Sequence, residues 1–406
     1  MEFTKRTLGD ICDEVKGIVQ TGPFGSQLHK SDYKDEGIPV VMPKNIIEDK
    51  ISIEEIARIG KKDVERLSQH KLQKGDIVYG RRGDIGRRAL IKGEQAGWLC
   101  GTGCIKISLK NASILEPSFL YYYLGQPEIV SWIYNQAIGA TMPNLNTSII
   151  RSIPITYPSL TTQKKIAYIL SSYDDLIENN TRRIEILEQM AKLVYEEWFV
   201  KFRFPGHENV KMVPSDLGEI PKRWKVREVS EILKRFKAGK KYTQDNVLEE
   251  GLIPVIDQSE KEILGFHNDI ADHSASLKNP IMIFGDHTCK IKILIEPFSV
   301  GPNVIPFRSE DYPEIFVFFL IKNLVQTKEY KRHWNELQAK RVVLPDVPLA
   351  MDFVNVVNPL FKQITLLEHK NQNLRKTRDL LLPKLISGEI DVSDLDIHIR
   401  NGVQES

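Results

Sequence analysis

The residues best suited to chemistry in this sequence are arginines set among glycines. The stretch Gly80–Arg88 contains Arg81, Arg82, Arg87 and Arg88, with Gly83 and Gly86 between the two pairs. Glycine lets a backbone approach a ligand closely, and a guanidinium either clamps a phosphate or reads the edge of a guanine. A solvated hairpin tip would explain any single arginine equally well. We predict that this loop contacts nucleic acid.

A second group of cations lies in the other half of the chain. Lys240 and Lys241 follow Gly239 at the end of a basic stretch, and Gly285–Lys290 contains His287 and Lys290, with Lys292 two residues on. These side chains are all suited to phosphates or base edges. An ordinary polar turn is the competing interpretation. We take Lys240, Lys241, His287, Lys290 and Lys292 as the candidate contacts of the second half.

Catalytic motifs are absent from the sequence. It has no GxxxxGK[ST], HExxH, GxSxG or GxGxxG pattern, and its nine histidines are scattered. Cys100 and Cys104 lack the spacing and histidine partners of a zinc site, so we expect buried thiols. A site assembled from distant residues would leave no such pattern. We therefore expect a non-catalytic chain that holds no metal and no cofactor.

Composition narrows the class of protein. The chain has 406 residues, 41% hydrophobic and 27% charged, with 56 Lys+Arg against 54 Asp+Glu. This near balance argues against coating nucleic acid by bulk charge but allows a local basic face. The longest apolar run, Ile315–Ile321, is much shorter than a membrane span, and no signal peptide follows Met1. We expect a cytoplasmic protein of two or three domains.

Two long helices must position these loops. From Thr161 to Phe199 there is neither glycine nor proline, and apolar residues recur at alternating steps of four and three. A second series of this kind runs from about Ala350 to Ile386, with Pro383 and Gly388 marking its end. This 3.5-residue period is typical of a coiled coil, and each helix would be roughly 50–58 Å long.

The polar residues in the two seams suggest how the helices pair. In an antiparallel alignment that sets Trp198 opposite Phe353, Asn180 falls opposite Asn371. Two buried amides satisfy each other, so this register is favoured, and we predict an intramolecular antiparallel coiled coil. Two independent amphipathic helices are the alternative.

The segments before each helix resemble each other. Glu36–Val41 matches Glu250–Ile256, Lys74–Gly80 matches Asn279–Gly285, and Phe119–Leu124 matches Phe316–Leu320. Short β-branched runs separated by Gly and Pro indicate α+β domains. We therefore predict an α+β fold in which two globular domains are joined by two long helices forming an antiparallel coiled coil. The predicted boundaries are 1–157 and 205–348 for the domains, 158–204 and 349–388 for the helices, and 389–406 for an acidic tail.

Four motifs occur in a fixed order along the chain. They are Thr21–Leu28 (TGPFGSQL), Pro158–Leu170 followed by Asp174-Asp175-x-Ile177-Glu178, Gly218–Trp224, and Leu382–Ile390. Together they resemble the specificity subunit of type I restriction–modification systems, over nearly the whole chain. The second half departs from the pattern, because it lacks the Gly-Pro-Phe-Gly-Ser signature and has Met351-Asp352 where a glutamine is expected.

The resemblance implies two target-recognition domains, each reading one half of a split sequence in double-stranded DNA. It implies two methyltransferase (modification) subunits and a restriction/translocase subunit as partners, which would carry S-adenosylmethionine, Mg and ATP. Gly22, Phe24 and Ser26 are expected to lie against the DNA. A rod of about 50 Å or more, against about 34–36 Å per DNA turn, would space the two readers along the duplex.

Two other classes of function are weighed against this interpretation. A fused nuclease or methyltransferase is one, and the absence of the Asn-Pro-Pro-Tyr methylation motif counts against the latter. A coiled-coil adaptor whose globular parts bind protein rather than DNA is the other. The arginine loop distinguishes the adaptor from a DNA-reading subunit, because an adaptor would not need these arginines for DNA targeting.

Overall fold

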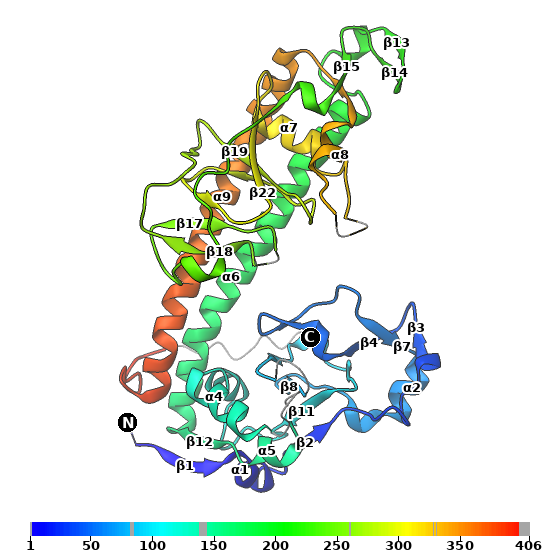
Figure 1. The fold of residues 1–406 in the computed structure, drawn as a ribbon. Coiled ribbons are helices and arrows are strands. Elements are labelled where there is room, and N and C mark those ends of the chain that lie inside the picture. The colour runs from blue at the N-terminus through cyan, green and yellow to red at the C-terminus, as the bar shows by residue number, and fades with distance from the viewer. Residues whose placement is uncertain are drawn as a thin grey trace. The chain divides into compact units, whose positions relative to one another are not determined.

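Two long helices, α6 (Leu160–Tyr195) and α9 (Val347–Ser387), contribute to both compact units of the chain. The computed structural model describes residues 2–81, 85–137, 144–259, 261–327, 329 and 331–397 (Figure 1). The first unit comprises Met1–Asn179 and Lys370–Ser406, and the second is Asn180–His369. Each unit therefore combines a globular part with a portion of both long helices.

The start of α6 is fixed by side chains that replace missing backbone partners. The Ser159 hydroxyl accepts a hydrogen bond from the backbone N of Thr162 at 3.3 Å. Gln163 is fully buried, and its Nε2 donates to the carbonyls of Ile114 (3.0 Å) and Pro158 (2.9 Å). The helix thus starts at Leu160, two residues after the predicted boundary of 158. At its other end, α6 continues into a π-helical turn, Glu196–Val200.

The helix α9 contains two prolines within its length. Pro359 and Pro383 both lie inside Val347–Ser387, and the helix ends before Gly388, whose φ of 80° suits glycine. The prediction that Gly388 ends the helix is confirmed. Pro383 does not end it, because the helix continues through the proline for one more turn.

The two helices are antiparallel in each unit, as predicted. In the first unit, Arg378 Nη1 lies 2.5 Å from Asp174 Oδ1, and Asn371 Nδ2 donates to the Ile177 carbonyl at 3.4 Å. In the second unit, the Phe353 ring lies against Tyr195 and Trp198, with ring centroids 6.0 and 6.2 Å away. The pairing of Asn180 with Asn371 stays a prediction, because the two residues belong to different units.

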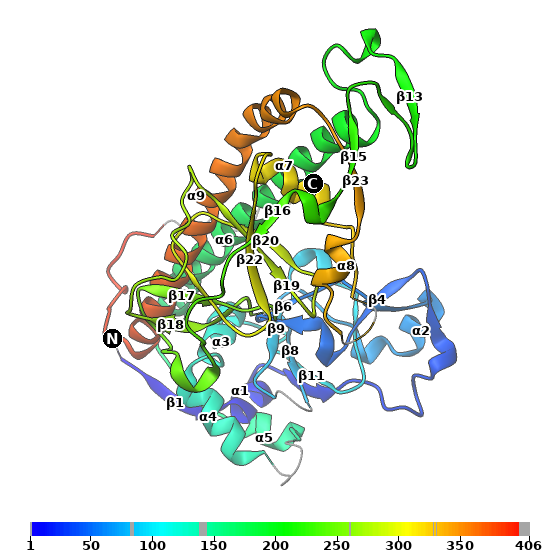
Figure 2. The ribbon, with the colours of Figure 1, turned by 45° about the horizontal axis from the view of Figure 1, so that its top comes forward.

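The globular part of the first unit contains two four-stranded sheets, whose strands lie side by side in the orders β2-β11-β8-β9 and β10-β4-β7-β3 (Figures 1 and 2). The pairs β1/β12 and β5/β6 complete its strands. The strands are β1 Thr4–Thr7, β2 Ile18–Thr21, β3 Tyr33–Lys34, β4 Ile38–Val41, β5 Ile46–Ile47, β6 Lys50–Ile51, β7 Ala57–Ile59, β8 Ile77–Gly80, β9 Arg88–Leu90, β10 Leu99–Cys100, β11 Cys104–Ser108 and β12 Pro154–Tyr157. The short α-helices are α1 Leu8–Glu14, α2 Lys61–Arg66, α3 Pro117–Tyr123, α4 Pro127–Gln136 and α5 Thr147–Arg151.

The second unit has the same plan. Its sheets have the orders β16-β22-β19-β20 and β18-β17-β21, with the pairs β15/β23 and β13/β14 beside them. The strands are β13 Met212–Ser215, β14 Gly218–Pro221, β15 Lys225–Glu228, β16 Leu233–Arg235, β17 Ile253–Ile256, β18 Ile263–His267, β19 Ile281–Gly285, β20 Ile291–Leu294, β21 Ser299–Val300, β22 Val304–Ser309 and β23 Arg341–Leu344. The α-helices are α7 Glu314–Ile321 and α8 Trp334–Gln338.

Strand order and register confirm the repeat predicted from sequence. β4 pairs in parallel with β10, as β17 does with β21, whereas β8 and β19 lie at equivalent places in antiparallel sheets. The register sets Cys104 opposite Gly80 and Val304 opposite Gly285. We call residues at matching register positions equivalent. The four-stranded sheet β2-β11-β8-β9 is therefore equivalent to β16-β22-β19-β20.

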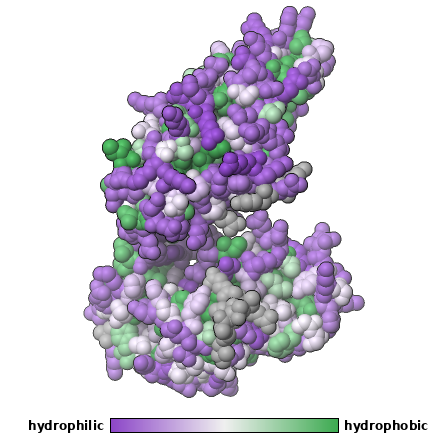
Figure 3. Space-filling view, viewed as in Figure 1, coloured by the Kyte–Doolittle hydropathy of each residue, from purple (hydrophilic) through white to green (hydrophobic). Residues whose placement is uncertain are grey.

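Each unit buries its own apolar core, to which the long helices contribute. The first core includes Ile166 and Leu170 of α6 and Leu385 of α9, and the second includes Ala191 of α6 and Phe353 of α9. Outside these cores, polar residues dominate the surface of both units on the face shown in Figure 3.

The four cysteines are buried and unpaired, and burial raises the pKa of the Cys100 thiol to about 12. The prediction of buried thiols is confirmed.

The segment after α9 belongs to the first core in part. Val392 is 1% exposed and packs in that core, and Lys165 Nζ of α6 donates to the Ser393 carbonyl at 2.6 Å. The solvated acidic tail predicted for 389–406 is therefore wrong for the residues around Val392. Residues 398–406 lie outside the described part of the chain.

Candidate nucleic-acid interface

Three loops of the first unit leave the same edge of the sheet β2-β11-β8-β9. β2 ends at Thr21, β11 begins at Cys104, β8 ends at Gly80 and β9 begins at Arg88. Because neighbouring strands are antiparallel, these ends meet at one edge. Hydrogen bonds join the loops, since Arg81 N donates to the Gly103 carbonyl (2.8 Å) and Thr102 Oγ1 to the Pro23 carbonyl (2.9 Å). We call the described residues 22–28, 81, 85–87, 101–103 and 144–146 the first loop cluster.

The Gly-Pro-Phe-Gly-Ser motif forms a tight turn in this cluster. Gly22 is packed so closely that an added Cβ would lie 1.9 Å from the Gly101 carbonyl oxygen. Phe24 N donates to Gln27 Oε1 at 3.1 Å, and Gln27 N donates back to the Phe24 carbonyl at 2.8 Å. These bonds leave the Phe24 ring 57% exposed, with Ser26 exposed beside it. The turn thus presents an aromatic ring and a hydroxyl on a rigid backbone.

The four predicted arginines have different environments. Arg81 Nε donates to the Leu145 carbonyl at 2.8 Å, so its guanidinium is partly engaged within the cluster. Arg87 is exposed at the last position of the loop, where its carbonyl accepts from Gly80 N at 2.9 Å. Arg82 lies outside the described residues.

Arg88 is packed inside its domain. Its side chain is 9% exposed, its Nη1 lies 3.2 Å from Asp49 Oδ1, and its Nε donates to the Tyr121 carbonyl at 3.1 Å. The guanidinium also stacks over the Tyr121 ring at 5.1 Å and fills space that the lack of a side chain at Gly125 provides. Because its guanidinium is held inside the domain by these contacts, Arg88 is not presented by the first loop cluster.

A second loop cluster lies at the equivalent edge of the second unit. Here β16 ends at Arg235, β22 begins at Val304, β19 ends at Gly285 and β20 begins at Ile291. The hydrogen bonds repeat, since Asp286 N donates to the Asn303 carbonyl at 2.8 Å and Gly285 N to the Lys290 carbonyl at 2.8 Å. We call residues 236–241, 286–290, 301–303 and 331–335 the second loop cluster. Lys290 is therefore equivalent to Arg87.

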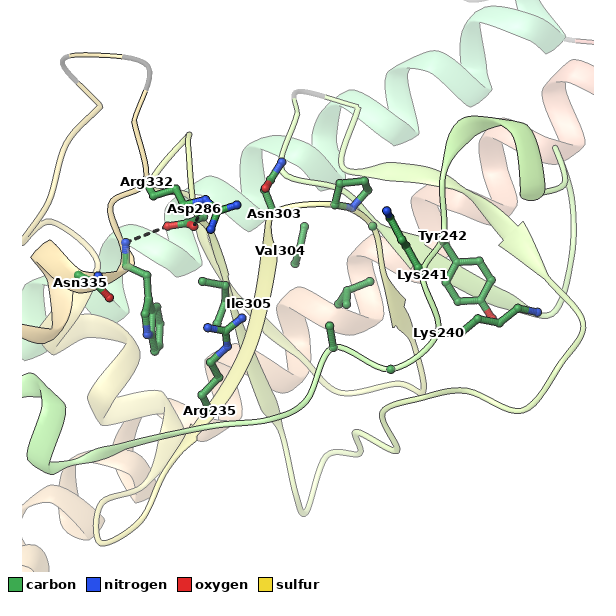
Figure 4. A pocket seen from close by; sticks show the side chains of 16 residues that line it. Arg235, Lys240, Lys241, Tyr242, Asp286, Asn303, Val304, Ile305, Arg332 and Asn335 are labelled. Atoms are coloured by element: carbon green, nitrogen blue, oxygen red, sulfur yellow. Dashed lines mark hydrogen bonds and ion pairs between the residues drawn. The ribbon is translucent and has the colours of Figure 1, made fainter.

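The second loop cluster encloses a cavity of about 310 Å³ with mixed charge (Figure 4). Arg235, Lys241 and Arg332 supply cations, and the buried Asp286 supplies a carboxylate 3.8 Å from Arg332 Nε. Asn303 and Asn335 add amide donors and acceptors at the rim. This combination suits a polar, partly anionic ligand.

The predicted cations of the second unit fall into two groups. Lys240 and Lys241 both line the cavity, but Lys240 Nζ pairs at 2.7 Å with Asp269, which is outside the lining, and this ion pair raises the pKa of Lys240. His287 Nδ1 lies 3.0 Å from the Lys331 carbonyl, and Lys290 Nζ donates to the Ser259 carbonyl at 3.1 Å. Lys292 lies within β20 and pairs with Glu262, the residue before β18, so it is not among the loop residues. Lys241, His287 and Lys290 thus belong to loops of the second loop cluster, and of these three only Lys241 lines the cavity.

Four charged or amide side chains that line the cavity are not among the contacts predicted from sequence, namely Arg235, Asn303, Arg332 and Asn335. Arg235 belongs to the basic stretch before Lys240, so charge pattern gave a partial signal. Arg332 precedes α8 and Asn335 lies in its first turn, and this segment reaches the site through long-range pairing with Asp286. Local sequence held no signal for them.

Among the described residues, no group of three His, Cys, Asp or Glu side chains is placed to hold a metal ion. No helix in the described ranges is both long and apolar enough to cross a membrane.

Comparison with known proteins gives concordant matches. A family model described as the type I restriction modification DNA specificity domain matches residues 1–189. The type I restriction enzyme MjaIX specificity subunit of Methanocaldococcus jannaschii is 29% identical, covering 97% of this chain and 98% of its own. The putative MjaX specificity subunit of that organism is 24% identical, over 96% and 97%.

A solved structure supports the fold. The crystal structure of a type I restriction-modification system S subunit from M. genitalium aligns with a TM-score of 0.57 and 18% identity, covering 95% of this chain and 96% of that one. The ordered motifs, the duplicated domains and full-length relatives agree with one another. The chain belongs to the family of non-catalytic DNA specificity subunits of type I restriction–modification systems.

Proposed function

We propose that each loop cluster reads one half of a bipartite target in double-stranded DNA. The observation that carries this proposal is the repetition of one backbone plan with different side chains at the same sheet edge. The first cluster offers Gly22, Phe24, Ser26 and Arg87, with Arg81 bonded to the Leu145 carbonyl within it. The second offers Lys241, His287, Lys290 and the cavity residues. Two loop clusters with the same backbone arrangement but different side chains are suited to recognise two different base sequences.

The partners follow from the family. We propose that two methyltransferase subunits and a restriction/translocase subunit assemble on this chain. An exposed apolar stripe on α6 supports this, since Ile186, Met190 and Leu193 are 49%, 47% and 58% exposed at helical spacing. S-adenosylmethionine, Mg and ATP are proposed to bind the partners and not this chain. The complex is proposed to act in the cytoplasm, where its DNA substrate lies.

Methylome sequencing of a methylation-free host tests the proposal. The host would express this chain with its neighbouring methyltransferase, and a split motif with a fixed gap is the expected result. The methyltransferase alone serves as the control and should leave no motif. Absence of new methylation from a complex that co-purifies would overturn the proposal and favour the adaptor.

A further inference from the structure

Arg81 and Asp286 occupy equivalent positions with opposite charges. Each follows the glycine that ends the central strand, Gly80 of β8 or Gly285 of β19. Their backbone N atoms donate to the carbonyls of Gly103 and Asn303, both at 2.8 Å, and their carbonyls accept from the N atoms of Leu145 and His333, both at 2.9 Å. The backbone around the two residues is therefore the same, although one is a cation and the other an anion.

Both side chains hold the same kind of segment by hydrogen bonds of opposite direction. Arg81 Nε donates to the Leu145 carbonyl at 2.8 Å. Asp286 Oδ1 accepts from the backbone N of His333 at 3.0 Å and of Trp334 at 2.9 Å. The segments held are 144–146, which leads into the short helix α5, and 332–335, which overlaps the start of the short helix α8. We call them the first and second straps.

A direct DNA contact does not explain this pair of residues. Asp286 is 6% exposed, and its negative charge opposes phosphate. Holding a strap is the role that both side chains share. The second strap is fixed further by Trp334, which is 5% exposed and lies 5.6 and 5.2 Å from the rings of Phe284 and Phe307.

The anchored strap presents two polar side chains at the cavity. Arg332 and Asn335 flank the buried His333 and Trp334, and both are exposed and line the cavity (Figure 4). Arginine pairs with the O6 and N7 atoms of guanine, and asparagine with the N6 and N7 atoms of adenine. A rigid backbone beneath such side chains fixes which base each one reaches.

From this geometry we infer that the straps are base-reading elements and that Arg81 and Asp286 are their positioning residues. Arg332 and Asn335 are the specificity-determining side chains of the second strap, with guanine and adenine edges as their targets. This inference rests on the proposed function, because it assumes that the second loop cluster reads DNA.

Methylome sequencing of variant complexes tests the inference. Arg332→Ala and Asn335→Ala are surface changes, and each should reduce discrimination at one base pair of one half-site by about tenfold or more. Asp286→Ala should relax several positions of that half while the other half stays unchanged. Asp286→Asn keeps the Oδ1 acceptor and should retain the motif. Lys211→Ala, an exposed cation outside the cluster, is the matched control.

A salt titration separates positioning from phosphate contact at Arg81. Arg81→Ala should relax the other half-site without changing the slope of DNA affinity against salt, whereas loss of a phosphate contact lowers that slope by about one. A lowered slope, or unchanged half-sites in Arg332→Ala and Asp286→Ala, would overturn the inference. The unchanged half-site in each variant reports a folded complex. A wild-type complex without any split motif would overturn the proposed function as well.

Discussion

The two recognition domains share a backbone plan but attach to the long helices by different chemistry. In the first unit, Tyr122 of α3 donates to Asp174 Oδ2 of α6 at 2.5 Å, and Arg378 of α9 pairs with the other oxygen of that carboxylate. In the second unit, Phe319 of α7 is equivalent to Tyr122 and stacks on Tyr195 of α6 with centroids 5.5 Å apart. The hydrogen bond between Tyr122 and Asp174 in the first unit thus corresponds to the stacked rings of Phe319 and Tyr195 in the second unit.

The two units thus share the arrangement of their strands but differ in the side-chain contacts that attach the globular part to the long helices. The aromatic attachment is stabilised mainly by buried apolar area and tolerates small shifts, because the hydrophobic effect is non-directional. The polar attachment depends on a directed network whose partners lose their hydrogen bonds when one member is removed. The two units should therefore respond differently to substitution.

The largest effect is expected at the aromatic attachment. Phe353 is fully buried and contacts the rings of Tyr195, Phe199 and Phe316. Phe353→Ala should lower the free energy of unfolding of the second unit by about 3–5 kcal/mol, measured by chemical denaturation. Phe361→Ala is the matched control, because this partly buried ring contacts the cluster through Phe319 and should cost less. Equal costs would contradict the comparison.

A smaller effect is expected at the polar attachment. Asp174→Ala removes the acceptor of Tyr122 and the partner of Arg378, whose side chain is 28% exposed and so partly solvated. The cost in stability should be about 2 kcal/mol, measured in the same denaturation assay. Asp379→Ala also removes an ion pair of Arg378, but a more exposed one, and should cost under about 0.5 kcal/mol. If Asp174→Ala were as mild, the network would not hold the domain.

The next prediction compares equivalent cations of the two loop clusters. Arg87→Ala and Lys290→Ala should each weaken DNA binding of the methyltransferase complex by roughly tenfold and lower the salt slope by about one. The double variant should show the sum of the two effects, because the residues serve different half-sites. Salt titrations of binding measure both quantities. An effect from only one of the two would show that the clusters bind phosphate unequally.

The smallest effect concerns pH. Burial lowers the pKa of His70 in the first unit and of His273 in the second below the ordinary value of 6.5. A lowered pKa means that the unfolded chain takes up protons first, so stability present above pH 6.5 is lost as pH falls through the folded values. Thermal unfolding at pH 7 and pH 5.5 should show this loss, and His273→Gln should reduce it. An unchanged loss in that variant would exclude His273 as its source.

Much of the fold was predictable because it depends on local pattern. The heptad seam predicted α6 and α9, and the repeated runs predicted the equivalent strands β4 and β17. The burial of the Arg88 side chain was not predictable, because it depends on Asp49 and Tyr121, which come from distant segments of the sequence. The same holds for Arg332 and Asn335, which reach the cavity through a bond between residues 286 and 333. Sequence therefore identified the loops but not which side chains face outward.

The division of the chain into units has a consequence for its synthesis. The second unit is one continuous stretch, whereas the first needs Leu385, Ile386 and Val392 to complete its core. At about 5–20 residues per second, a ribosome takes roughly ten to forty seconds to make the intervening segment. During that time the core of the first unit stays incomplete, whereas the second unit can fold as soon as its own residues have been made. The order of maturation is thus the reverse of the order of translation, and a ribosome that stalls between residues 369 and 385 leaves only the first core open.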